Sequence, residues 1–287
     1  MICMSKIIDG KKISLELSDL LKNKISLLKD NGKDIVLSII QVGNDPAATI
    51  YKNSKIKKCA EFGITTKEYN FDENATTDEI VSLIHRLNND DEITGIFIEM
   101  PLPNHLDKKM IINEISYKKD IEGITDKNLG NIYNDNNGIL PATANSVYNL
   151  LKYENINLNG KNVVIMGRSN IVGKPLALMM LNDNATVTVC HSKTTDIKDI
   201  TNKADILIVA VNKEKYVDSS FIKDNAIVID VGIHRNTVDG KNMITGDVDY
   251  DSVKDKASYI TPVPGGVGPL TVVMLINNLV LAKEIYG

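Results

Sequence analysis

The chain has 287 residues, 43% of them hydrophobic, and its 33 Lys and Arg against 37 Asp and Glu give a net charge of −4. That apolar content suits about two folded domains and excludes intrinsic disorder, which needs low hydrophobicity and high net charge. The mildly acidic balance excludes a basic nucleic-acid-binding face, and no apolar run approaches the roughly 18 residues of a membrane span. Because the start, MICMSKIIDG, has no apolar signal core, we expect a cytoplasmic protein that handles a small molecule.

The first half of the chain alternates short β-branched runs with longer amphipathic stretches, which is typical of βα units around a mostly parallel sheet. The strands are expected at 36–42, 65–71 and 95–100, and the helices at about 13–29, 46–62 and 77–88. Residues 126–138 hold five Asn and two Gly with little apolar periodicity. This segment is therefore predicted to be a loop or a domain crossover.

A second series of βα units begins at residue 162. The pattern predicts a strand at 162–166, a glycine-bounded turn at 167–173, and a helix to about residue 182 with Pro175 in its first turn. Further strands are expected at 186–190, 205–211, 226–231 and about 258–261, and a helix at 271–286. The two series predict an α/β protein of two domains with a boundary near residue 145.

The cysteines and histidines give no sign of a metal centre. Cys3, Cys59 and Cys190 are odd in number and far apart, and the four histidines lack metal-ligand spacing. We expect neither a disulfide framework nor a metal site. His191 lies next to a predicted binding segment, where a plain loop role is expected.

The segment NVVIMGRSNIVGKPLALMML reads as strand, glycine turn and helix, the first unit of a nucleotide-binding domain. Glycines let a turn approach a pyrophosphate closely, and the following helix N-terminus offers free amides. The spacing of Gly167 and Gly173 differs from the usual G-x-G-x-x-G pattern. A purely structural turn in an ordinary α/β domain is the alternative interpretation.

The end of the next strand favours NADP over NAD. NAD-preferring domains tend to place a carboxylate there for the ribose 2′-hydroxyl, but this chain reads Cys-His-Ser-Lys-Thr from residue 190. The hydroxyl of Ser192 and the cation of Lys193 suit a 2′-phosphate, which Arg168 in the first turn is placed to reach. The alternative is that these are solvated loop residues.

In the first half, Tyr51 and Lys55 lie four residues apart and share one helix face. By itself this pair is more typical of solvent-exposed side chains without a functional role. The segment GIFIEMPLP, however, places Glu99 at the carboxyl end of a buried strand, where open α/β sheets bind ligands. The segment KDIEG adds a second carboxyl position in a loop. A lysine and two carboxyls near one crevice suit a polar heterocycle and acid–base chemistry.

Together these motifs resemble the bifunctional methylenetetrahydrofolate dehydrogenase/methenyltetrahydrofolate cyclohydrolase family. The resemblance covers essentially the whole chain. It rests on VGNDPAATIYKNSKIKKCAEFGI, GIFIEMPLP, KDIEGI, GRSNIVGKP with CHSKT, VIDVGI, GDVDY and TPVPGGVGPLTVVML. The last segment carries Gly265, Gly266 and Gly268, which would let backbone come close to a ligand.

The resemblance implies two domains that face a cleft, the first holding folate and the second, Rossmann-like, holding NADP. Residues 1–145, joined by the C-terminal helix 271–287, would form the folate-binding catalytic domain, and residues 146–270 the NADP-binding domain. It also implies a homodimer.

Site residues follow from the same resemblance, position by matching position. Tyr51 would stack on the folate, Lys55 would be the catalytic lysine, and Glu122 would hold the pterin edge. The remaining folate-side residues would be Pro264, Gly265 and Gly266, and the NADP-side residues Gly167, Arg168, Ser169 and Ser192, with Ile233 beside the nicotinamide.

Three departures from the family pattern fall at the site. Glu99 stands where the family usually has Gln, and Glu122 where it usually has Asp. Residues 141–146, Pro-Ala-Thr-Ala-Asn-Ser, replace the usual Pro-Cys-Thr-Pro-x-Gly. The backbone there loses a proline and a glycine.

These departures lead to different expectations for the two reactions. An ionised Glu99 would stabilise the positive charge of the methenyl product, so dehydrogenase activity should persist. It would also favour the ammonium form of Lys55 and slow a hydrolysis that needs the neutral lysine. The contrary possibility is that Glu99 itself acts as the base for water. The competing functions are a dehydrogenase-only folate enzyme, an NADP-linked oxidoreductase of the shikimate type, and a non-catalytic NADP- or folate-binding sensor.

Overall fold

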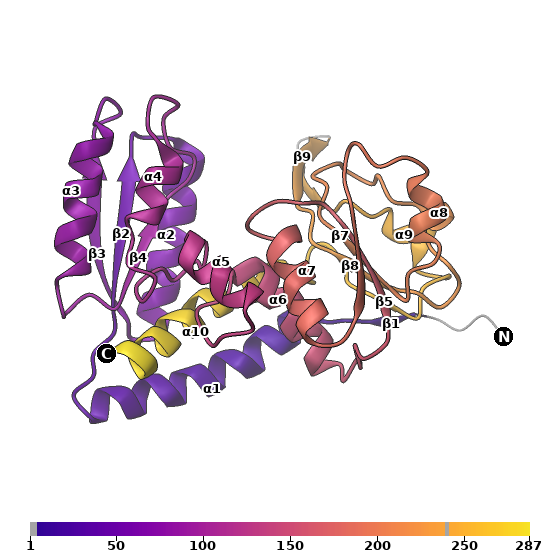
Figure 1. The fold of residues 1–287 in the computed structure, drawn as a ribbon, viewed down its shortest axis with the longest axis horizontal. Helices are drawn as coiled ribbons and strands as arrows, with labels where there is room; N and C mark the ends of the chain where they lie inside the picture. The colour runs from indigo at the N-terminus through magenta and orange to yellow at the C-terminus, as the bar shows by residue number, and fades with distance from the viewer. Residues whose placement is uncertain (1–4, 239–240) are drawn as a thin grey trace. The chain divides into compact units, whose positions relative to one another are not determined.

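The computed structural model describes residues 5–238 and 241–287 (Figure 1). The chain forms two compact units. Unit 1 comprises the chain up to Glu16 together with Thr143–Thr271, and unit 2 comprises Leu17–Ala142 and Val272–Gly287. Residues 5–16 thus group with unit 1, whereas the family resemblance implies that they belong to the domain of residues 1–145.

Unit 2 is built on a three-stranded parallel sheet in the order β3-β2-β4. Its strands are β2 (Val36–Val42), β3 (Thr65–Phe71) and β4 (Gly95–Ile98), and its main helices are α2 (Pro46–Glu61) and α3 (Thr77–Asn88). Every residue of the central strand β2 is buried. This is expected of a parallel strand that is covered on both faces.

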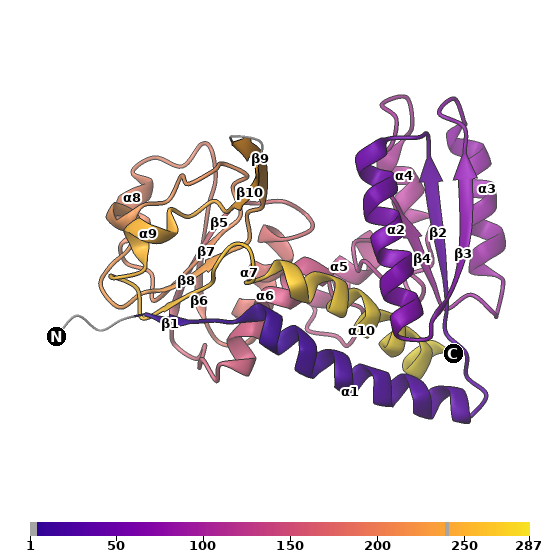
Figure 2. The ribbon, with the colours of Figure 1, turned by 180° about the vertical axis from the view of Figure 1, so that it is seen from behind.

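The two faces of β2 belong to different hydrophobic cores. Leu37 and Ile39 pack in the core that includes residues of α2, while Val36 and Ile40 pack in the core of α3. Figures 1 and 2 show α2 and α3 on opposite sides of the strands. The alternation follows from the two-residue side-chain period of a strand. Both helices are therefore fixed by one central strand, with the carboxyl ends of β2 and β4 side by side.

Helix α10 (Gly268–Tyr286) is long and strongly apolar. By length and composition it could cross a membrane, which the sequence pattern did not anticipate, but half of the tested stretch is buried within the protein. Its residues Val273, Ile276 and Leu279 are in the core of unit 2. Asn278 donates from its side-chain amide to the carbonyl oxygens of Ile121 and Leu140. These contacts are those of a core helix.

Unit 1 contains a six-stranded, wholly parallel sheet in the order β1-β11-β8-β7-β5-β6. The strands are β1 (Lys6–Ile7), β5 (Asn162–Met166), β6 (Thr186–Cys190), β7 (Ile206–Val209), β8 (Ile227–Asp230) and β11 (Tyr259–Ile260). The chain leaves β5 for β6 on one side and later adds β7 on the other. The carboxyl end of β5 is thus a topological switch point, where such sheets bind ligands.

Further elements surround these sheets. In unit 2 they include α4 (Lys108–Asn113) and α5 (Asp126–Tyr133), with most of α1 (Gly10–Asp30). In unit 1 they are chiefly α6 (Ala142–Tyr153), α7 (Gly173–Asn182), α8 (Ile197–Thr201), α9 (Tyr250–Val253), a short 3₁₀ turn (Ser219–Phe221) and the antiparallel hairpin of β9 (His234–Val238) and β10 (Lys241–Thr245).

The strand predictions are confirmed, four of them with the expected bounds, while β4, β7, β8 and β11 are shorter. The prediction of a loop or a domain crossover over residues 126–138 is wrong for 126–133, which form α5, whereas residues 134–138 contain neither helix nor strand. Thr125 caps this helix by accepting a hydrogen bond from the backbone amide of Asn128, and Ile132 is buried. A side-chain cap and one buried contact outweigh the weak helix propensity of the asparagines.

Candidate active site

Helix α2 carries the first group of functional candidates. Asp45 caps it by accepting from the amide of Ala48, and Pro46 occupies its first position. Tyr51 is 47% exposed, whereas the side chain of Lys55 is 18% exposed. The ammonium nitrogen of Lys55 lies 6.0 Å from the ring centroid of Tyr51 and 4.5 Å from that of Phe97. The shared helix face thus turns a lysine inward beside a half-exposed aromatic ring.

Glu99 meets that lysine from the end of β4. The Lys55 ammonium is 2.8 Å from Oε1 and 3.0 Å from Oε2 of Glu99, so the carboxylate is held by both oxygens. Glu99 is 4% exposed, and its backbone amide donates to the carbonyl of Ile40 in β2. Charges this deep need a partner, because removing either one leaves the other buried and unpaired. The structure therefore joins Lys55 and Glu99 into one ion pair at the carboxyl edge of the sheet.

Glu122 lies in a segment that runs beside β4. The amide of Ile96 donates to the carbonyl of Lys119, and Ile96 forms a parallel bridge with Asp120. Asp120 is buried, and its carboxylate accepts from the amides of Gly123 and Thr125 and from the side-chain amide of Asn128. Asp120 thus anchors the loop that carries Glu122. The KDIEG motif contained this anchor, but sequence reasoning gave it no role.

The carboxyl group of Glu122 is half-buried and differs from its two acidic neighbours. Among the residues that the structure describes, it has neither an ion pair nor a hydrogen-bond donor. Burial and then the charge of Asp120 raise its pKa to about 8, an effect that Lys55 opposes and Glu99 reinforces. Unit 2 therefore brings together a half-exposed ring, a paired lysine and a carboxyl that holds its proton near neutral pH.

In unit 1 the turn after β5 is shaped by close backbone contacts. Gly167 has a φ of +125°, and a Cβ there would lie 2.3 Å from the carbonyl oxygen of Ala210. A Cβ on Gly173 would lie 2.1 Å from the carbonyl oxygen of Gly167. Ser169 accepts a hydrogen bond from the amide of Val172 at the start of α7. Both glycines are thus required by the turn itself, which leads from a buried strand to a helix N-terminus.

A cavity of about 240 Å³ lies at this turn. The structure brings together Gly167, Arg168 and Ser192 around it, as the sequence predicted them to be neighbours, with Ser169 adjacent in the chain. The wall also includes His191, Val211, Lys213 and Tyr216, of which sequence reasoning singled out only His191. The amide of Lys193 donates to His191 Nδ1, so the imidazole helps to shape the loop after β6.

Gly265 and Gly266 are buried in unit 1, whereas Pro264 before them is exposed. Gly265 has a φ of +117°, and its carbonyl accepts from the amide of Lys11. A Cβ on Gly10 would lie 1.8 Å from the carbonyl oxygen of Gly266. The peptide bonds before Pro264 and Pro101 are cis. The close contact with Gly266 requires a glycine at residue 10. The positive φ of Gly265 and the 2.7 Å between a Cβ on Gly266 and the carbonyl oxygen of Pro262 give the paired glycines a structural reason, in addition to the ligand approach that the sequence suggested.

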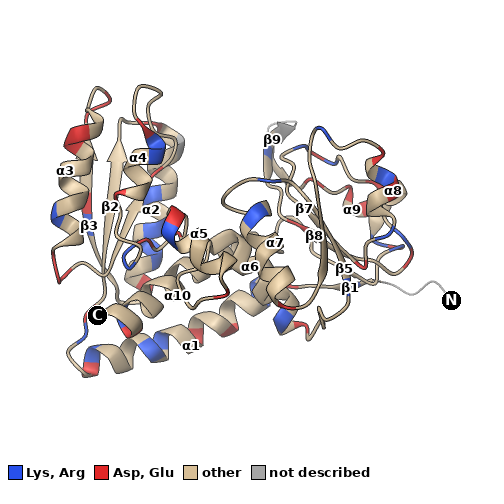
Figure 3. Cartoon of the chain, in the orientation of Figure 1, with Lys and Arg blue, Asp and Glu red and all other residues tan. Residues whose placement is uncertain are grey.

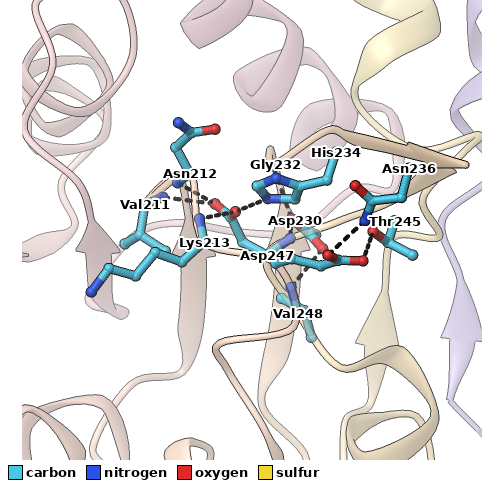
Figure 4. A network of polar contacts seen from close by, with 11 residues as sticks. Val211, Asn212, Lys213, Asp230, Gly232, His234, Asn236, Thr245, Asp247 and Val248 are labelled. Atoms are coloured by element: carbon cyan, nitrogen blue, oxygen red, sulfur yellow. Dashed lines mark hydrogen bonds and ion pairs between the residues drawn. The ribbon is translucent and has the colours of Figure 1, made fainter.

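Ile233 follows β8 and is 50% exposed, with its Cδ1 atom 3.3 Å from where a Cβ on Gly268 would lie. Sequence reasoning missed the polar network beneath it. Asp230, Asp247 and His234 form hydrogen bonds that join the segments around Ile233 to the loop after β7 (Figure 4). The available signal was an aspartate within two residues of a glycine in both VIDVGI and GDVDY.

The cysteines and the possible metal ligands do not extend the candidate site in the described part of either unit. Cys59 and Cys190 are free and buried, while Cys3 lies outside the described residues. Burial raises the pKa of the Cys59 thiol to about 12. Within residues 5–238 and 241–287 no three histidine, cysteine or acidic side chains gather as metal ligands would. Figure 3 shows lysines and arginines interspersed with acidic residues along the ribbon of each unit.

Two family models match this chain. The tetrahydrofolate dehydrogenase/cyclohydrolase catalytic domain matches residues 8–122, and the NAD(P)-binding domain of the same family matches residues 141–286. The bifunctional protein FolD of Agathobacter rectalis is 50% identical over 281 residues, which cover 98% of this chain and all of that protein.

Comparison with solved structures indicates the same family. The bifunctional FolD of Campylobacter jejuni is 44% identical with a TM-score of 0.93, covering 98% of this chain and 99% of that one. The Trypanosoma brucei enzyme, complexed with NADP cofactor and inhibitor, is 34% identical with a TM-score of 0.91, covering 98% of each chain.

A shikimate dehydrogenase of Aquifex aeolicus has a TM-score of 0.53 at 11% identity, covering 85% of this chain and 91% of that one. At that identity the likeness extends to the fold alone. The two family models and the full-length relatives, by contrast, show that the chain belongs to the tetrahydrofolate dehydrogenase/cyclohydrolase family.

Proposed function

We propose that this protein oxidises 5,10-methylenetetrahydrofolate to the 5,10-methenyl compound with NADP and hydrolyses that product to 10-formyltetrahydrofolate. The observation that carries the proposal is the cluster of Tyr51, Lys55 and Glu99 at the carboxyl edge of the unit 2 sheet. It lies in a chain whose relatives, up to 50% identical, are named as bifunctional enzymes of this reaction pair. The shikimate-type and non-catalytic alternatives are not favoured, because neither accounts for both family matches.

The folate side is assigned from the family resemblance, position by matching position. The half-exposed ring of Tyr51 stacks on the substrate, and Glu122 contacts the pterin edge. Pro264, Gly265 and Gly266 complete the folate-side assignment.

NADP is assigned to the cavity at the switch point of unit 1. Gly167 and Ser169 supply the turn at a helix N-terminus that suits a pyrophosphate. Arg168 and Ser192 meet the 2′-phosphate, and the segment after β6 offers no carboxylate there. Ile233 borders the nicotinamide. When bound, NADP accepts the hydride, and the residues of this chain bind and orient it.

Hydride transfer needs orientation more than a base, because the adjacent nitrogen lone pair of the substrate drives it. The carbon that loses hydride becomes part of a cation. The negative charge of Glu99 balances the positive charge of Lys55, so the net charge of the ion pair is zero. The cation that develops on the substrate is therefore not repelled by an unpaired ammonium. The dehydrogenase step is therefore retained.

Hydrolysis places a different demand on the same pair. Water that attacks the methenyl carbon must lose a proton, and an ammonium cannot accept one. The carboxylate of Glu99 contacts the Lys55 ammonium through both oxygens, so the nitrogen that would have to accept the proton is already engaged in an ion pair. We therefore expect cyclohydrolase activity to be weak relative to hydride transfer.

The decisive experiment measures NADP reduction and methenyl hydrolysis separately on the purified chain and on Glu99→Gln. We expect hydrolysis to rise about tenfold or more in the variant, within the range of a general acid–base contribution. Glu92→Gln is the matched control, because Glu92 forms an exposed ion pair with Lys67. If the wild type hydrolyses rapidly and Glu99→Gln is slower, Glu99 is a base and its assigned effect is wrong.

The partners of the chain complete the proposal. We place it in the cytoplasm as a homodimer that binds a folate substrate, with neither nucleic acid nor a membrane as a partner. Its close bacterial relatives and its mixed surface charge support this assignment. Light scattering of the purified protein tests the dimer, and a mass equal to one chain at micromolar concentration contradicts it.

A further inference from the structure

Asp247 is a fully buried aspartate whose carboxylate accepts hydrogen bonds from backbone amides instead of pairing with a lysine or arginine in the described part of the chain (Figure 4). Its Oδ2 accepts from the amides of Val211 at 2.7 Å and Asn212 at 3.0 Å, and its Oδ1 from the amide of Lys213 at 2.8 Å. Three consecutive amides on one carboxylate fix the path of this loop. Because Val211 and Lys213 line the cavity at the end of β5, Asp247 fixes one wall of that cavity.

The same carboxylate also holds a residue on another segment. His234 Nε2 lies 2.8 Å from Oδ1 of Asp247, and the imidazole is only 17% exposed. His234 directly follows Ile233, whose own side chain is half exposed. One acid therefore joins the loop after β7 to the segment after β8.

Asp230 supports this arrangement from behind. Its carboxylate accepts from the amides of Gly232, Asp247 and Val248. A Cβ on Gly232 would lie 2.4 Å from the carboxyl carbon of Asp247, so the segment before Ile233 passes directly over the buried acid. Neither lysine nor arginine from the described part of the chain pairs with these two carboxylates. Their charges are stabilised by backbone dipoles instead.

We propose that His234 and Asp247 are a pair of positioning residues that sets the nicotinamide half of the cofactor relative to its phosphate half. Asp247 holds the cavity wall at residues 211–213, and through His234 it holds the segment that presents Ile233. The inference rests on the proposed function, in which the cavity takes the 2′-phosphate end and Ile233 the nicotinamide. It adds that Asp247 and His234 connect the residues at the 2′-phosphate end of NADP with the residue at its nicotinamide end.

The test separates the two halves of the ligand. Dissociation constants are measured for NADP and for adenosine 2′,5′-bisphosphate, which lacks the nicotinamide, and kcat is measured for NADP reduction. His234→Leu removes the donor to Asp247 but leaves three amides on the carboxylate. We expect kcat to fall about tenfold, the scale of one charge-assisted hydrogen bond, with the bisphosphate constant changed less than about twofold.

His234→Gln is the matched variant, because its side-chain amide can still donate to Asp247. It should recover at least half of the rate lost in His234→Leu. Asp247→Asn replaces one acceptor oxygen by a donor facing backbone amides, so we expect both dissociation constants to rise about tenfold. The His234 variants keep the test independent of whether Asp247→Asn folds.

Three results overturn the inference: an unchanged kcat in His234→Leu, an equal loss of affinity for both ligands in that variant, or no recovery in His234→Gln. Equal losses would mean a general loosening of unit 1. A wild-type protein without folate oxidation would instead contradict the proposed function.

Discussion

Glu99 in unit 2 is stabilised differently from Asp230 and Asp247 in unit 1, whereas Asp120 of unit 2 resembles those two aspartates because it also accepts from backbone amides. In unit 2, Glu99 is paired with the ammonium of Lys55, a long side chain that is itself partly exposed. In unit 1, Asp230 and Asp247 are held by backbone amides, three each, with His234 as an additional neighbour of Asp247. A charge paired with a side chain can exchange protons and partners during a reaction, whereas a charge surrounded by amides is fixed to the fold. Proton chemistry is therefore expected in unit 2 and ligand positioning in unit 1.

The largest expected effect comes from breaking the ion pair of unit 2. Lys55→Met leaves Glu99 buried without a partner, which costs about 3 kcal/mol of unfolding free energy. Hydrolysis should fall about a hundredfold or more, because the group that manages protons is lost. Denaturant unfolding and the hydrolysis assay measure the two effects.

A double variant separates charge burial from chemistry. Lys55→Met combined with Glu99→Gln buries no charge, so most of the lost stability should return while hydrolysis stays low. The control Lys67→Met breaks an exposed ion pair and should change stability by less than about 1 kcal/mol. Recovery of hydrolysis in the double variant would contradict the role assigned to Lys55.

The same contrast explains which parts of the site could be predicted from sequence. Lys55 and Glu99 are chemically distinctive residues at recognisable places, a helix face and a strand end, so pattern and resemblance found both. The amides that hold Asp247 belong to residues 34 to 36 positions earlier, and backbone amides carry no residue signature. Helix α5 was missed for a related reason, because its cap at Thr125 and the Asn128–Asp120 hydrogen bond stabilise a segment with weak helix propensity.

An intermediate effect concerns Arg168, an exposed side chain on the cavity of unit 1. If it meets a 2′-phosphate, Arg168→Gln should raise the dissociation constant for NADP about tenfold to a hundredfold and leave that for NAD unchanged. Lys174→Gln is the control, because Lys174 is a nearby cation outside the cavity wall that contacts Asn170. Equal losses for NADP and NAD would contradict the phosphate assignment and make Arg168 part of the fixed scaffold.

The smallest effect is expected for Glu122, whose carboxyl lacks both a cation and amide donors within the described residues. Burial raises its pKa to about 8, whereas an unfolded glutamate titrates near 4.3. The folded protein holds this proton more tightly, so the stability that it contributes is complete below pH 4 and is lost as the pH rises through about 8. The unfolding free energy of the wild type should therefore fall between pH 5 and 9 by about 1 kcal/mol or more.

Glu122→Gln cannot ionise and should lose the part of that fall that Glu122 causes, which makes it more stable than the wild type at pH 9. The remaining fall, near pH 5 to 6, belongs to Asp230, because burial raises the pKa of its carboxyl to about 6. Glu61→Gln, which changes an exposed glutamate paired with Lys58, should keep the wild-type pH dependence in this range. Chemical denaturation at a series of pH values measures all three proteins. Parallel curves for the wild type and Glu122→Gln would mean that Glu122 is already ionised at neutral pH.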